Sequence, residues 1–162
     1  MARAYAVSFQ NVTISATANM AQVFVNPGAT CSLEFLRGWF SQAGSTTSNM
    51  ETVALQTQVT AFPTLTSATP AKLNLLDPAS QITGATTGAA GTAGTVGSAI
   101  GAGAKSAVYS DNFNVLNGWL WVPTPMETIV MNAGAASGLG LYSPSSAVTT
   151  PSWSGGLTYQ ER

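Results

Sequence analysis

Histidine is missing from this 162-residue chain. Because histidine is the usual general base near neutral pH and the commonest transition-metal ligand, its absence removes the simplest route to acid–base, triad and zinc chemistry. Cysteine occurs once, at Cys31, so no internal disulfide framework can form and a buried apolar thiol is expected. The chain therefore has few of the side chains from which catalytic sites are built.

Charge is scarce as well: charged residues make up 7% of the chain, against about 25% in typical soluble proteins. The basic residues are scattered singly, so no nucleic-acid partner is expected. No apolar run reaches the roughly 18 residues of a membrane-spanning helix, so no membrane partner is expected either. The opening "MARAYAVSFQ" alternates instead of forming the apolar centre of a signal peptide, which predicts synthesis and folding in the cytoplasm.

The six carboxylates are spread out, with none within three positions of another. Paired-carboxylate hydrolysis needs two such groups about 5 to 9.5 Å apart, and nothing in the spacing indicates such a pair. "GTAGTVG" has the glycines of a phosphate loop, but no Lys-Ser/Thr pair follows it. We therefore predict a protein that is not an enzyme, and we assign no catalytic, cofactor-binding or metal-binding residue.

Alternating apolar residues point to β-strands along most of the chain. In residues 5–17 the alternation changes parity between Phe9 and Val12, which predicts a bulge near Asn11. Residues 50–61 allow a helix by composition, but their Thr and Val positions favour a strand. Strand patterns spaced about 8 to 12 residues apart, with turn signals between them, predict one all-β domain over residues 1–162 built as two packed sheets.

Two segments depart from this pattern. Residues 62–78 contain three prolines and are predicted to form a long connector. Residues 82–104 are dominated by Gly, Ala and Thr, with Val96 and Ile100 as their other sizeable apolar residues. Such a tract buries little area, but it lacks the charge that usually accompanies disorder. We expect it to form an extended loop or arm that becomes ordered on a neighbouring subunit.

The stretch "GWLWVPTP", from Gly118 to Pro125, is apolar on both sides if it is a strand. Trp119 and Trp121 then share one face, while Leu120 and Val122 share the other. The prolines that follow end the strand or place it at a sheet edge. This pattern predicts a strand packed against its own opposite sheet and against something else; the alternative is an exposed aromatic platform for a ligand such as a sugar.

The candidate partner interface combines the large aromatic residues with the two apolar residues of the Gly-rich tract. Trp and Phe bury large areas wherever they pack, which makes them good anchors for protein contacts. The candidate residues are Trp119, Trp121, Trp39, Phe40, Trp153, Val96 and Ile100.

Three stretches carry a resemblance to a known family: "MARAYAVSFQNVTISA", "YSDNFNVLNGWLWVPTPMETIVMNAG" and the closing "GLTYQE". Together they resemble small virion proteins encoded by tailed bacteriophages and prophages. The match lies at the N-terminal strand and in the C-terminal third, whereas the tract 82–104 and the loop "SQAGSTTSN" depart from the family pattern. The resemblance implies a jelly-roll-like antiparallel β-sandwich and a role as a head decoration or cement protein.

The leading hypothesis is therefore a non-enzymatic virion protein at the capsid surface, assembled in the host cytoplasm, that binds and stabilises the shell of major capsid protein. It is expected to work without a cofactor and as a homo-oligomer, with a trimer favoured. The alternative is a receptor- or glycan-binding module associated with a tail or fibre, because jelly rolls also occur in lectins. A pilus-like or cell-surface subunit is less well supported, since a signal peptide is not recognised.

Overall fold

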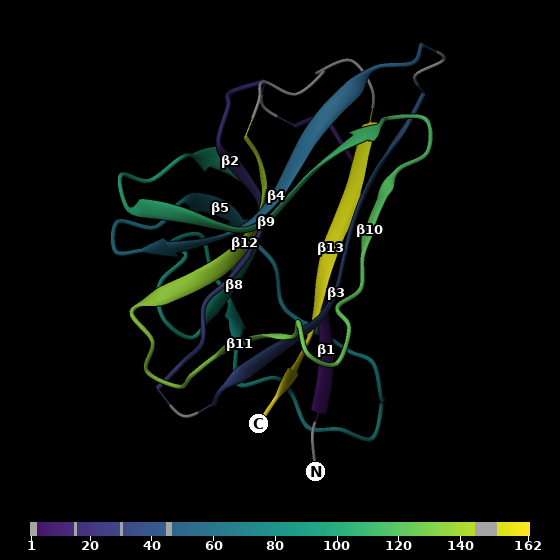
Figure 1. Cartoon of the computed structure of the whole chain (residues 1–162). Coiled ribbons are helices and arrows are strands. Elements are labelled where there is room, and N and C mark those ends of the chain that lie inside the picture. Colours follow the sequence, from purple (N-terminus) through teal and green to yellow (C-terminus); the bar gives the residue numbers. More distant parts are fainter. Residues whose placement is uncertain (1–2, 15, 30, 45–46, 145–151) are drawn as a thin grey trace.

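The computed structural model describes residues 3–14, 16–29, 31–44, 47–144 and 152–162. These residues form two antiparallel sheets packed face to face, and none of them is helical. Figure 1 shows the two sheets as separate layers, with both ends of the chain together at one end of the sandwich. The expected all-β sandwich is confirmed.

Each sheet has one central path of strands. The first sheet runs in the order β10 (Trp119–Trp121), β3 (Leu33–Ala43), β13 (Ser152–Glu161), β1 (Arg3–Val12) and β6 (Ala71–Lys72), and β11 (Ile129–Met131) also pairs with β3. The second runs in the order β5 (Thr64–Ser67), β8 (Thr92–Ala99), β2 (Met20–Val25), β12 (Ser137–Ser143), β4 (Met50–Val59) and β9 (Ala104–Asn114). The short β7 (Thr83–Gly84) lies parallel to β8.

The strand order is nested. If β5 to β8 are set aside and β10 and β11 are taken as one interrupted strand, eight strands remain. The first then pairs with the last, the second with the seventh, the third with the sixth and the fourth with the fifth. This arrangement is a long hairpin folded over itself into two sheets, which is the jelly roll. The resemblance had implied this topology.

The strands form where the sequence alternates. In β1, Tyr5 and Val7 face the core and lie opposite Tyr159 and Leu157 of β13. The register shifts between Phe9 and Val12, and Asn11 within this interval has a φ of 53°. Asn tolerates this left-handed conformation better than most residues do. The predicted bulge near Asn11 is confirmed, as is the strand at residues 50–59.

The main core lies between the sheets and is rich in aromatic residues. Cys31 lies in it and is almost completely buried, and burial raises the pKa of its thiol. The prediction of a buried thiol is therefore confirmed. The largest fully buried side chains of the protein include Trp153, Tyr5, Tyr159, Phe35, Phe40 and Ile14.

The Gly/Ala/Thr-rich tract of residues 82–104 is not the extended loop or arm that we expected. It contains β7 and β8, and β8 lies inside the second sheet between β5 and β2. A Cβ added at Gly94 of β8 would lie 2.7 Å from Leu65 Cβ and 2.9 Å from the Thr66 carbonyl oxygen. The glycines therefore let the tract lie against the backbone of its own chain, so a neighbouring subunit is not needed to order it.

The proline-containing segment 62–78 passes from one sheet to the other, since its β5 belongs to the second sheet and its β6 to the first. Where it starts, Phe62 and Leu65 pack on Phe24 and Tyr142, forming a small second core on the outer face of the second sheet. The Tyr142 hydroxyl donates a hydrogen bond to Gln58 Oε1 at 2.5 Å.

The two lateral edges of the sandwich differ. At one edge, β6 extends the first sheet beyond β1, and β8 and β5 extend the second sheet beyond β2. At the other edge, β9 ends the second sheet while β10 and β11 end the first. We call β5 to β8 the inserted strands, because they are additional to the eight strands of the jelly roll. They cover one edge of the sandwich and leave the β9 edge open.

Candidate functional site

The two tryptophans of "GWLWVPTP" face inward. Trp119 and Trp121 belong to the main core, and Trp121 is only 8% exposed. Leu120, which lies between them, points outward and is 62% exposed. The strand is therefore covered on its tryptophan face by its own chain, and its Leu120 face is open in the isolated protein.

The other residues of the predicted interface fall in different places. Phe40 and Trp153 lie in the main core and have almost no exposed surface to offer a partner. Val96 packs against the same core, and Ile100 is half-buried at the end of the Gly-rich tract. The predicted residues thus do not form one continuous surface.

Trp39 is the aromatic residue of that set that lies on the outer face of the first sheet. Its ring leaves no room for a side chain at Gly156, and the Arg37 guanidinium lies 4.9 Å from its ring centroid. Leu120 is directly opposite Trp39 across the strand pair β10–β3. Trp39, Leu120 and Arg37 therefore form a small apolar and cationic surface outside the sandwich.

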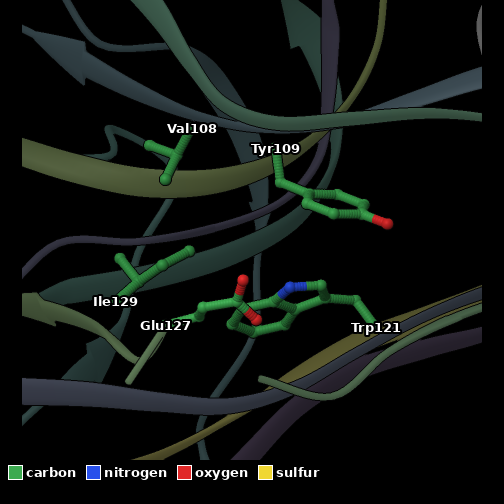
Figure 2. Close-up of a pocket in the computed structure, with 5 residues that line it drawn as sticks. All are labelled: Val108, Tyr109, Trp121, Glu127 and Ile129. Atoms are coloured by element: carbon green, nitrogen blue, oxygen red, sulfur yellow. The ribbon is translucent and has the colours of Figure 1, made fainter. Parts of the chain in front are cut away.

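A cavity of about 200 Å³ opens at the uncovered edge, between β9 and the interrupted strand β10–β11. Figure 2 shows Val108 and Tyr109 on one side of this cavity, with Trp121, Glu127 and Ile129 on the other. We call it the mouth pocket. It combines aromatic rings, aliphatic side chains and one carboxylate, and both sheets contribute to it.

A β-bulge places two neighbouring side chains in the mouth pocket. In the β4–β9 pair, Leu55 lies opposite Tyr109 and Gln56 lies opposite Ala107, so Val108 is an extra residue. Neighbouring residues of a regular strand point to opposite faces, and a bulge re-aims side chains. Val108 and Tyr109 can therefore both line the same cavity.

Glu127 reaches the pocket from a hydrogen-bonded turn. The Glu127 amide donates to the Thr124 carbonyl oxygen at 2.9 Å, and the Thr124 hydroxyl donates to Glu127 Oε2 at 2.9 Å. Pro125 occupies the second position of this turn, where its fixed φ is favourable. The turn holds one carboxylate oxygen, and within the described part of the chain the other oxygen, Oε1, has no hydrogen-bond partner.

The sequence did not single out Val108, Tyr109, Glu127 or Ile129 as site residues. The bulge at Val108 depends on the pairing of β9 with β4, which the spacing of apolar residues does not show. The one available signal was "PTPMET", in which proline and threonine precede Glu127 in the pattern of a tight turn.

A second cavity, of about 430 Å³, lies under the inserted strands near Lys72 and Ser80. Beside it the Ser80 hydroxyl donates to Glu161 Oε1 at 2.5 Å, and the Gln81 amide donates to the same oxygen at 3.0 Å. The Ser80 and Tyr159 hydroxyls lie 3.1 Å apart, and burial raises the pKa of Tyr159 above its usual value. These hydrogen bonds attach the segment between β6 and β7 to the end of β13. Their role is therefore structural.

Within the described ranges, no three acidic or cysteine side chains come close enough together to hold a metal ion. The same residues include no helix that is long and apolar enough to cross a membrane.

Comparisons with protein-family models, with curated proteins and with solved structures found no match. The fold, the exposed surface and the mouth pocket are therefore the features that bear on the function of the chain.

Proposed function

We propose that this protein is a non-enzymatic structural protein of a tailed-bacteriophage virion, a head decoration or cement protein that binds the major capsid protein. The observation that carries the proposal is the exposure of large apolar side chains in two loops. Leu75 and Leu76 are 87% and 93% exposed, and Met126 is 95% exposed. Leu75 and Leu76 are adjacent in the chain, and adjacent exposed apolar side chains support a surface that contacts another protein.

The loop with Leu75 and Leu76 is ordered. Asn74 organises it, because its Oδ1 accepts a hydrogen bond from the Leu76 amide at 3.1 Å and its carbonyl oxygen accepts one from the Asp77 amide at 3.0 Å. The Leu73 amide donates to the Ala4 carbonyl oxygen at 3.0 Å, which attaches the loop to β1. The two leucines are thus held toward solvent by a fixed turn, as a docking contact requires.

The fold and composition agree with this role. Jelly rolls are common in viral capsid domains, although the fold hosts many functions. A shell protein gains affinity from many symmetric copies, so a small apolar contact on each copy is sufficient. We propose a homo-oligomer, a trimer, at the capsid surface.

The test uses particles purified from the bacterium that carries the gene. Mass spectrometry should find the chain in intact particles, and mild denaturant should release it before the shell breaks. Recombinant protein should rebind stripped particles, and L75S/L76S should rebind more weakly. The matched control is L116S, which removes another exposed leucine away from this loop. If the chain is absent from the particles, or if both variants rebind equally well, the proposal fails.

A glycan-binding module on a tail or fibre is the second candidate, and the mouth pocket is the observation that favours it. The rings of Trp119 and Trp121 are packed in the core, so a sugar would have to meet Tyr109 and the accessible part of Trp121. A glycan array with the native protein and with Y109A distinguishes the candidates. Specific sugar binding that Y109A abolishes would favour the second candidate.

A further inference from the structure

We propose that the mouth pocket is a binding site for an ammonium or guanidinium group. The inference does not depend on a virion role, because it follows from the chemistry of the pocket. The location is distinctive: the inserted strands cover the opposite edge of the sandwich, whereas here β9 and β10–β11 leave a cavity of about 200 Å³.

Two aromatic rings face the cavity from opposite sheets. Figure 2 shows the Tyr109 ring on the β9 side and the Trp121 indole on the β10 side, with the cavity between them. Trp121 is held firmly because it is largely buried in the main core. Tyr109 also contacts Trp119, with ring centroids 6.3 Å apart, so the Tyr109 ring has a second aromatic neighbour in the core.

The charge of the lining is negative. Glu127 is the charged residue among the described lining side chains. Thr124 donates to its Oε2, and no described residue donates to its Oε1. Asp111 adds a second carboxylate at the same edge. It is paired with Val53 and Tyr109 is paired with Leu55, and both of these partners face the core. Asp111 and Tyr109 therefore lie on the same face of β9. A cation that enters the pocket therefore meets a carboxylate as well as the rings.

This combination suits a cation better than a neutral ligand. Aromatic faces attract ammonium and guanidinium groups through the ring quadrupole, and the attraction grows when water is displaced. A charged hydrogen bond to Glu127 adds to it. The cavity lies below the roughly 300 Å³ lower limit of pockets for drug-sized ligands, so a group the size of a side-chain terminus fits. The cation can belong to a free amine or to a Lys or Arg side chain of another protein.

The experiment titrates the full chain with n-butylammonium and methylguanidinium chloride and follows the assigned Trp121 indole N–H by NMR. Methyl glucoside serves as the neutral probe. Both cations should shift this resonance and those of Val108 and Tyr109. E127Q, which keeps the shape of the side chain, should weaken binding by about tenfold or more. D77N, which removes an equal charge elsewhere, should leave the affinity unchanged. Added salt should weaken binding to the native protein, because the pocket is partly open to solvent.

Short acetylated peptides with one central Lys or Arg distinguish the two sources. Tighter binding of a peptide than of its free cation assigns the site to a protein side chain, whereas equal binding assigns it to a small amine. The proposal is overturned if neither cation shifts Trp121, if E127Q and D77N behave alike, or if only methyl glucoside binds. None of these outcomes affects the test of the virion role, which uses particles and the Leu75–Leu76 loop.

Discussion

The rings of Phe40 and Trp153 stack almost in parallel, with an angle of 10° between their planes and centroids 4.7 Å apart. They come from β3 and β13, which are neighbours in the first sheet, and both rings lie inside the sandwich. Both residues therefore contribute to the stability of the fold, independently of what the protein binds.

Replacement of Trp153 by Ala should lower the free energy of unfolding by about 3–5 kcal/mol, because the change leaves a large cavity in the core. Urea denaturation monitored by circular dichroism measures the loss. The control is W39A, in which a half-buried tryptophan is removed from the outer face of the same sheet. W39A should cost clearly less, and an equal cost for the two variants would contradict the placement of Trp153.

The G94A variant should be destabilised by about 1–3 kcal/mol, since the added methyl group would press on Leu65 and on the Thr66 carbonyl oxygen. G28A is the matched control, because a Cβ there meets the backbone of Gly91 at 3.4 Å, an ordinary contact. Thermal unfolding of both variants gives the comparison. Tolerance of G94A would mean that the Gly-rich tract is not packed on its own chain as described.

Stability should fall with pH above about 10, the usual pKa of tyrosine. Burial raises the pKa of Tyr5, Tyr142 and Tyr159, so the folded protein keeps these phenols neutral while the unfolded chain ionises. This contribution is complete below the usual pKa and is lost as pH rises toward the folded values. Lys105 acts in the opposite sense, because burial lowers the pKa of its ammonium group.

Urea midpoints at pH 8, 9.5 and 10.5 measure this effect, and absorbance at 295 nm reports phenol ionisation. Y142F should show a weaker loss at high pH than the native chain, because one of the buried phenols is gone. An unchanged midpoint between pH 8 and pH 10.5 would contradict the burial of these hydroxyls.

Cys31 should react slowly with a thiol reagent such as DTNB in the native protein and quickly after unfolding. Its side chain lies in the core, and burial raises the pKa of the thiol, so little thiolate is present at neutral pH. A free cysteine-containing peptide provides the reference rate. Native reaction at the rate of the peptide would show that the core near Cys31 opens readily.

Much of the strand layout could be predicted because burial on one face requires alternation, and a change of parity requires a bulge. The bulge near Asn11 was predicted for this reason. Trp153 was listed instead as an interface candidate, although it shares its parity with Leu157 and Tyr159 and lies with them in the core. The same reasoning failed for residues 82–104. Their glycines indicate little burial per residue, but the missing side chains are what allow backbones to approach closely.

The mouth pocket could not be predicted for a different reason. Its rings and its carboxylate come from β9, β10 and the turn before β11. They meet only because the jelly roll brings β9, at the edge of the second sheet, close to the interrupted strand β10–β11 of the first. Even within β9, the direction of Val108 depends on its partner strand. The spacing of residues along the chain contains none of this information.

The pairing of β1 with β13 has a consequence for how the protein folds. Arg3 lies opposite Glu161. During synthesis β1 therefore cannot pair with β13 until the end of the described sequence has been translated. Closing such long loops costs entropy before any contact rewards it, and β-rich domains of this kind fold in milliseconds to seconds. During synthesis β1 therefore exposes an unpaired, alternating apolar strand, and rapid overproduction should favour aggregates over folded protein.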